Sequence, residues 1–141
     1  GGGCVRLDSS NMSVSEGVVV RDCVASYAAG IRMAAGSRLV AQTQVEFVNC
    51  RAWLENGGVM RVQESAVEAR GGVMFADNEA VQGAVAFLSG STMELSDGVR
   101  VLRNHATGTG GAVTLDGSST LLASRNVELV NQSAGLDGGV F

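Results

Sequence analysis

Proline and lysine are absent from this sequence, and aromatic residues make up only 4% of it. The lack of proline, beside 20 glycines, excludes collagen-like segments and proline-rich linkers and leaves many sites for tight turns. Because all ten basic residues are arginines and the net charge is −4, the chain offers no basic surface for nucleic acid or an anionic membrane. Apolar runs are far shorter than the roughly 20 residues of a membrane helix. We therefore expect no nucleic-acid partner and no membrane-spanning segment.

Motifs for metal and cofactor binding are missing as well. The three cysteines, Cys4, Cys23 and Cys50, match no CxxC or Cys/His metal spacing, and the single His105 has no second imidazole to join it. No nucleotide-binding or catalytic motif stands out either. We therefore expect no metal, no cofactor and no enzyme activity.

The sequence does contain enough apolar material for one folded domain. Its 141 residues are 45% hydrophobic and 17% charged, which argues against disorder. The glycine runs at 1–3 and 138–139 stand at the same phase of a repeating unit. We expect residues 1–141 to form a single domain that is a segment of a longer repeat protein.

An internal repeat of about 27 residues runs through the chain. Five valines recur at intervals of 27, 28, 26 and 28 residues, namely Val18, Val45, Val73, Val99 and Val127. The same registration aligns a serine column, Ser10, Ser37, Ser65, Ser91 and Ser119. It also aligns an alanine column, Ala25, Ala52, Ala80, Ala106 and Ala134. Matching residue types at one phase indicate stacked coils, because a solenoid places each residue above its counterpart.

Each unit contains three stretches with apolar residues at alternate positions, which is the periodicity of β-strands. In the first stretch the apolar pairs are Val5/Leu7, Ile31/Met33, Met60/Val62, Val85/Phe87 and Val113/Leu115. The sequence therefore predicts an all-β fold, a right-handed parallel β-helix of about five coils with three short strands per coil. An antiparallel sandwich requires no matching columns, and a helical solenoid conflicts with the valine-rich alternation and the many glycines.

Two short motifs recur along the chain. Gly-Gly pairs followed by apolar residues occur at 57–60, 71–74 and 110–113, and Phe-x-x-Asn occurs at 75–78, with partial matches at 47–50 and 101–104. These motifs resemble the GGAI and FxxN repeats of chlamydial polymorphic outer membrane proteins. The resemblance implies a pectin-lyase-like right-handed β-helix and a surface or secreted passenger domain, often adhesive and not an enzyme.

The phase of the FxxN asparagine holds a column of small polar and thiol side chains, Cys23, Cys50, Asn78, Asn104 and Gln132. We expect its amides to form a ladder that hydrogen-bonds the backbone of the corner from coil to coil. Cys23 and Cys50 are one coil apart, close enough for a disulfide, and the alternative is a pair of small buried thiols. Asn11 and Asn131 begin Asn-x-Ser sequons, which permit glycosylation in a eukaryotic secretory route.

Two outward columns carry charged side chains that are candidates for ligand binding. Arg6, Arg32 and Arg61 share one column, predicted to continue through Ala86 and Thr114, and could bind an acidic polysaccharide. Glu68 and Glu94 share another, at a spacing near that of the carboxylate pair of a retaining glycosidase. The alternative for both columns is a solvated surface.

An outward apolar strip on the third stretch is the candidate partner interface: Val19, Val48, Met74, Leu102 and Val130. Apolar side chains on a solvent-facing strand usually mark a contact surface, here for a protein partner or for flanking β-helix coils. Strand edges at the first and last coils also favour self-association through open ends.

Three functions in different classes are compatible with these patterns. The first is a noncatalytic structural or adhesive module of an extracellular or cell-surface protein. The second is a carbohydrate-binding or carbohydrate-cleaving β-helix, which requires a cleft at the arginine or glutamate column. The third is a structural accessory subunit of a large assembly, selected for its shape.

Overall fold

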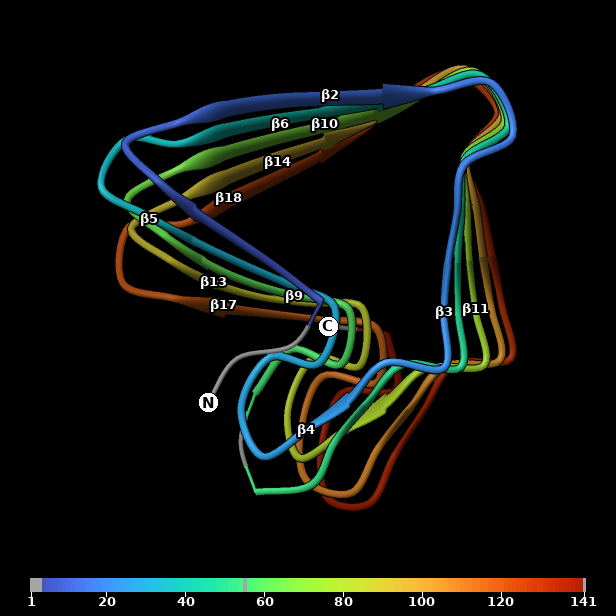
Figure 1. The fold of residues 1–141 in the computed structure, drawn as a ribbon. Coiled ribbons are helices and arrows are strands. Elements are labelled where there is room, and N and C mark those ends of the chain that lie inside the picture. Colours follow the sequence, from blue (N-terminus) through green and yellow to red (C-terminus); the bar gives the residue numbers. More distant parts are fainter. Residues whose placement is uncertain (1–3, 55, 141) are drawn as a thin grey trace.

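The computed structural model describes residues 4–54 and 56–140 and is all-β across these ranges, with twenty strands and no helix. The strands form four parallel sheets of five, and the chain passes through one strand of each sheet before it returns to the first. In Figure 1 the coils wind clockwise away from the viewer, which is a right-handed path. The predicted right-handed parallel β-helix of about five coils is therefore confirmed.

The first two sheets hold the longer strands. The first sheet consists of β1 (Val5–Asp8), β5 (Ile31–Ala34), β9 (Met60–Gln63), β13 (Ala86–Ser89) and β17 (Val113–Asp116). The second consists of β2 (Asn11–Ser15), β6 (Arg38–Gln42), β10 (Ala66–Arg70), β14 (Thr92–Leu95) and β18 (Thr120–Ala123).

The third and fourth sheets complete each coil. The third consists of β3 (Val19–Arg21), β7 (Glu46–Val48), β11 (Met74–Ala76), β15 (Arg100–Leu102) and β19 (Glu128–Val130). The fourth consists of β4 (Val24–Ala25), β8 (Arg51–Ala52), β12 (Glu79–Ala80), β16 (His105–Ala106) and β20 (Ser133–Ala134). The sequence predicts three strands per coil, and the structure adds this fourth, because strands of two residues are too short to show an alternating pattern.

The register of β13 differs from the predicted one. Ala86 and Leu88 pair with Met60 and Val62 and are fully buried, whereas Phe87 lies in the outward column. The predicted inward pair Val85/Phe87, with Ala86 outward, is therefore wrong by one residue. Residues 84–88 are apolar at every position, so alternation in the sequence does not determine which of them point inward.

The glycine pairs at 57–58 and 110–111 satisfy two different constraints at the start of the first strand, whereas the pair at 71–72 lies in the corner before β11. Gly57 and Gly110 have φ angles of +83° and +62°, in the left-handed region that favours glycine. Gly58 and Gly111 lie against the next coil, where an added Cβ would stand 2.3 Å and 2.1 Å from a backbone carbonyl oxygen. The pair therefore permits both the turn and the close stacking of coils.

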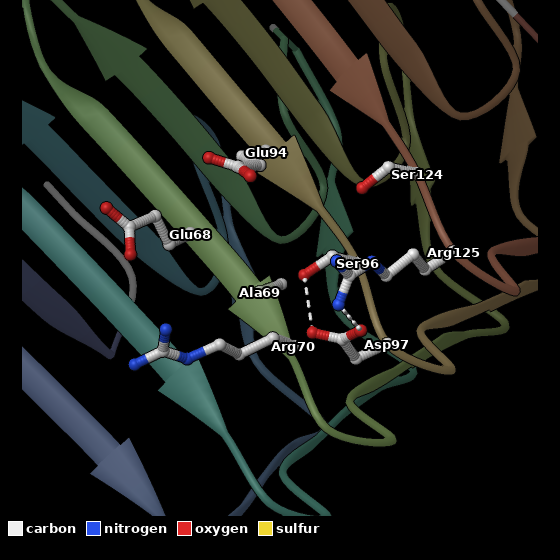
Figure 2. Close-up of a pocket in the computed structure, with 8 residues that line it drawn as sticks. All are labelled: Glu68, Ala69, Arg70, Glu94, Ser96, Asp97, Ser124 and Arg125. Atoms are coloured by element: carbon white, nitrogen blue, oxygen red, sulfur yellow. Dashed lines mark hydrogen bonds and ion pairs between the residues drawn. The ribbon is translucent and has the colours of Figure 1, made fainter.

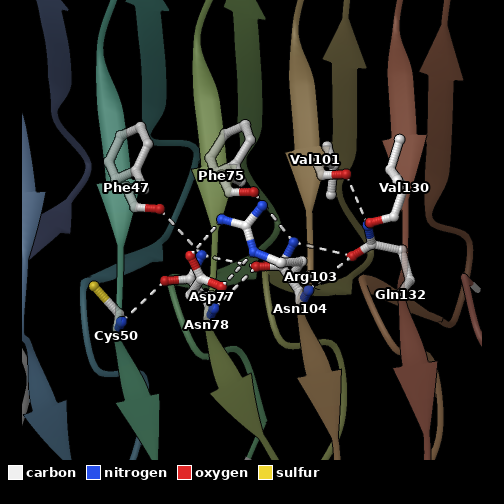
Figure 3. A network of polar contacts seen from close by, with 10 residues as sticks. All are labelled: Phe47, Cys50, Phe75, Asp77, Asn78, Val101, Arg103, Asn104, Val130 and Gln132. Carbon is white, nitrogen blue, oxygen red and sulfur yellow. Dashed lines mark hydrogen bonds and ion pairs between the residues drawn. The ribbon is translucent and has the colours of Figure 1, made fainter.

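The predicted amide ladder fills the corner between the third and fourth sheets (Figure 3). The Asn78 side chain, 1% exposed, donates to Phe47 O at 3.1 Å and to Asn104 Oδ1 at 2.9 Å, and its Oδ1 accepts from Cys50 N at 2.9 Å. Asn104 repeats the pattern with Phe75 O at 3.2 Å and Gln132 Oε1 at 3.0 Å. Each amide thus satisfies buried backbone groups of neighbouring coils, which are costly to leave unpaired.

A second ladder, of serine hydroxyls, stands at the corner between the first and second sheets. Ser37 N donates to Ser65 Oγ at 3.1 Å, Ser65 N donates to Ser91 Oγ at 3.2 Å, and the pattern extends to Ser10 and Ser119. The side-chain hydroxyls also donate to carbonyl oxygens two or three residues earlier in the same coil. This explains why serine recurs at that phase.

We expect Asn78→Ala to lower the free energy of unfolding by about 3 kcal/mol, because it leaves Cys50 N and Phe47 O buried without their partner. Urea denaturation followed by circular dichroism measures the change. Asn11→Ala, at an exposed strand position, is the matched control and should change it by less than about 0.5 kcal/mol. Equal losses in the two variants would contradict the structural role of the ladder.

Candidate functional site

A polar pocket of about 350 Å³ opens on the outer face of the second sheet, where the strands enter the corner towards the third (Figure 2). Glu68 and Glu94 are Cα partners on β10 and β14, as predicted, so their carboxylates lie one coil apart. The residues that line the pocket are Glu68, Ala69, Arg70, Glu94, Ser96, Asp97, Ser124 and Arg125. The sequence predicts the glutamate pair, and the serines and charged residues of the corner are additions from the structure.

The two carboxylates have different surroundings. Glu68 forms an ion pair with Arg38 of the preceding coil, and its side chain is 28% exposed. Glu94 is exposed and has no hydrogen-bond or ion-pair partner among the residues that the structure describes. The pocket thus offers the oxygen atoms of two carboxylates as hydrogen-bond acceptors, and those of Glu94 have no partner there.

The rest of the pocket is charged and hydroxylic. Arg70 donates to Gln42 Oε1 at 3.1 Å, and Ser96 Oγ donates to Asp97 Oδ2 at 3.2 Å. Asp97 also lies 4.0 Å from the guanidinium of Arg125. Within 4–54 and 56–140 no group of three His, Cys, Asp or Glu side chains could hold a metal ion. Such a pocket suits a ligand that carries several hydroxyl groups.

The arginine column lies on the outer face of the first sheet. Arg6 pairs with Arg32 and Arg32 with Arg61, as predicted, and Arg6 also forms an ion pair with Asp8 at 3.4 Å. The next position holds Phe87, which is only 9% exposed, and not Ala86 as predicted. The column of three cations therefore ends against an aromatic ring.

The predicted apolar strip lies on the outer face of the third sheet in two adjacent columns. Val48, Leu102 and Val130 share one column with Ala76, whereas Val19 and Met74 share the other with Glu46 and Arg100. Val19 and Val130 are 49% and 37% exposed, but Leu102 is only 8% exposed. The strip faces outward and is narrow.

Ion pairs between coils border this strip. Arg103 donates to both carboxylate oxygens of Asp77, at 2.8 Å and 2.7 Å, and Arg100 donates to Glu128 at 3.0 Å. The hydrogen bonds from Arg103 lower the pKa of Asp77, and Asp77 in turn raises the pKa of Arg103. The apolar side chains are thus flanked by charges that already have partners.

The disulfide joins Cys4 to Cys23, and the predicted bond between Cys23 and Cys50 is wrong. A coil is a closed circuit, so the start of β1 returns beside the corner that follows β3, and the two Cα atoms lie 6.3 Å apart. Cys50 is a buried free thiol whose sulfur lies 3.8 Å from Val48 O. Burial raises the pKa of the Cys50 thiol.

Both sequon asparagines are exposed. Asn11 begins β2, and Asn131 lies in the turn after β19 with a φ angle of +55°. Their glycosylation stays a prediction.

The sequence predicted the inward alanine column of the fourth sheet but no site residue on its outer face. Trp53, the single tryptophan, is 59% exposed directly after β8, beside Arg51 and Glu79. Sequence reasoning assigned no strand to this part of the coil. A lone tryptophan in a chain with 4% aromatic residues was the available signal.

No protein-family model, curated protein or solved structure matches this chain. The interpretation of the surfaces therefore rests on their own geometry. Across the described ranges no helix is long and apolar enough to cross a membrane.

Peptide mapping of the unreduced protein should recover a peptide pair linked through Cys4 and Cys23. Iodoacetamide at pH 8 should label Cys50 slowly in the native state and rapidly in urea, because its raised pKa and its burial leave little accessible thiolate. Mass spectrometry reads out both results. A linked pair that contains Cys23 and Cys50 would show that the corner column carries the bond instead.

Proposed function

We propose that this β-solenoid is a noncatalytic structural and adhesive module of an extracellular or cell-surface protein, and that it binds partners through its lateral faces. The observation that carries the proposal is the outward column that holds Val48 and Val130, its accessible apolar members, between ion-paired side chains. A protein interface commonly has this anatomy, an apolar centre with a polar rim.

The disulfide supports the extracellular part of the proposal. Disulfides persist in oxidising compartments and are rare in the cytosol. The Cys4–Cys23 bond encloses a loop of 19 residues within the first coil, a length for which a disulfide contributes about 3 kcal/mol. The two exposed sequons are compatible with the same route.

The resemblance to polymorphic outer membrane protein repeats supports the same function. The asparagines of FxxN form the corner ladder, and the glycine pairs permit the turn and the close stacking. The motifs that carry the resemblance thus serve the fold, which leaves the lateral faces free to differ in what they bind. This is what an adhesive passenger domain requires.

Beads coated with the protein should be retained under flow on layers of extracellular-matrix protein. Val48→Ser combined with Val130→Ser should weaken retention roughly tenfold, since apolar anchors dominate such interfaces. The control is Leu122→Ser on the second sheet, where the side chain is 59% exposed. Thermal melts should show that all variants fold. Equal losses in the strip and control variants, or no retention of the unaltered protein, would contradict the proposal.

Carbohydrate binding at the Glu68 and Glu94 pocket is a second candidate function. It is favoured by the open pocket itself, in which Glu94 has unused acceptor sites beside the hydroxyls of Ser96 and Ser124. The arginine column offers an additional contact for acidic polysaccharide.

Calorimetry with soluble oligosaccharides tests this second candidate. Glu94→Gln should weaken binding roughly tenfold, because an amide accepts fewer hydrogen bonds than a carboxylate. Arg32→Ala with Arg61→Ala should act only on acidic chains. Release of new reducing ends that Glu94→Gln abolishes would instead indicate a carbohydrate-cleaving enzyme.

A further inference from the structure

The outer face of the fourth sheet carries Trp53 in a distinctive position. Side chains alternate between the two faces of a strand, so Arg51 and Trp53 point outward on either side of Ala52, which is 3% exposed. The indole is 59% exposed and is the only one in the chain. An indole left this exposed has a large apolar face available for a ligand.

A hollow forms beside the indole because the side chains at the same phase become smaller along the stack. Thr107 N donates to Ala80 O at 2.9 Å and Gly135 N to Ala106 O at 2.9 Å, which continues the pairing of Trp53 N with Ala25 O at 3.2 Å. The outward positions after the alanine column are therefore Trp53, Val81, Thr107 and Gly135 in successive coils. The resulting hollow of about 170 Å³ is lined by Trp53, Val81 and Thr107, with Arg51 and Glu79.

The two charged side chains keep most of their hydrogen-bonding capacity. Arg51 and Glu79 are Cα partners on β8 and β12, and Arg51 Nε lies 3.7 Å from Glu79 Oε2. That distance is an ion pair rather than a hydrogen bond, and neither side chain has another polar partner among the residues that the structure describes. The guanidinium donors and carboxylate acceptors are open to a ligand, while their charges cancel.

We propose that this hollow is a subsite for one pyranose ring of a neutral saccharide. The C–H face of the ring would stack on Trp53, because the indole face carries the negative part of its quadrupole. Hydroxyl groups at the edge of the ring both donate and accept, so they match Glu79, Arg51 and the Thr107 hydroxyl. The hollow is smaller than the about 300 Å³ at which sites for drug-sized ligands begin, which limits the ligand to one ring here.

Charge and solvation select the ligand class. A uronic or sulfated ring would bring its anion beside both Arg51 and Glu79, whose opposite charges cancel, so the hollow gives an anion no net attraction to offset the loss of its hydration. An apolar protein side chain inserted into the hollow would remove water from Arg51 and Glu79, whose exposures are 45% and 37%, without replacing the hydrogen bonds that the water makes. Sugar hydroxyls replace those bonds. The subsite lies on a different sheet from the apolar strip and the Glu68 pocket, so binding at the subsite can be tested independently of them.

Trp53 provides its own readout, because the intrinsic tryptophan fluorescence of this chain comes from it alone. Titration with neutral oligosaccharides, such as gluco-, manno- and galacto-oligomers, should produce a saturable change in emission. The dissociation constant should be about 1 mM for one bound ring. Oligogalacturonate at the same concentrations should bind at least tenfold more weakly.

Variants separate the subsite from a general surface effect. Arg51→Ala and Glu79→Gln keep the fluorophore and should each weaken binding roughly tenfold. Leu54→Ala is the matched control, because Leu54 is 69% exposed next to Trp53 and does not line the hollow. Trp53→Ala, measured by calorimetry, should abolish binding.

Three results would overturn the proposal. They are no saturable response to any neutral oligomer, equal binding of oligogalacturonate, and a loss in Leu54→Ala as large as in Arg51→Ala. Loss of bead retention in Trp53→Ala without any saccharide binding would identify the indole as an anchor for a protein partner instead. If the variants of the apolar strip show no effect in the bead-retention assay, the result of the saccharide titration is unaffected.

Discussion

The structure depends on one constraint, which is that successive coils stack in register through parallel strand pairing. Adjacent strands lie about 4.8 Å apart, so any residue type that recurs at one phase becomes a ladder. Inside the coil this ladder is apolar, with Phe47 stacked on Phe75 at 5.1 Å between ring centroids. At the corners it is polar, and Asn78 and Asn104 connect four coils through their amides. The polar corners stay buried at low cost because each group finds its partner one coil away.

The same constraint determines what the lateral faces can do. Outward side chains also meet their counterparts in neighbouring coils, so charged residues pair across coils, as Arg103 does with Asp77. In the functions proposed above, binding takes place at the positions where a column is interrupted. Such interruptions occur at the unpaired Glu94 and where Trp53 is followed by smaller side chains. The two pockets described above therefore lie where the regular columns of outward side chains are interrupted.

The sequence predicted those features that recur in every coil. The columns of valine, serine and alanine predicted the parallel stack, and the pairings of Glu68 with Glu94 and Arg32 with Arg61 followed directly from them. Features that occur once, or that lie where the sequence does not alternate, could not be predicted in this way. Residues 84–88 are all apolar, and the structure begins the inward pattern of β13 one position later than predicted, which places Phe87 outward.

The disulfide could not be predicted from the repeat columns, for a different reason. Phase indicates which residues are neighbours along the stack, but it does not indicate which residues meet across the interior of one coil. Cys4 and Cys23 meet in that second direction, which requires the path of the backbone in three dimensions. The fourth sheet was missed for a related reason, because two residues per strand carry too little alternation to be recognised.

The fixed distance between paired strands has a kinetic consequence. Every strand partner is one coil away in the sequence, as in the pairing of Val67 with Met93, and no sheet joins distant parts of the chain directly. The mean sequence separation of contacts therefore does not grow as coils are added, unlike in a sandwich, where the contact order depends on the whole topology. Folding of such an array proceeds by nucleation of one coil and growth at its edges, so the entropic cost of closing each new coil is the same for a short array as for a long one.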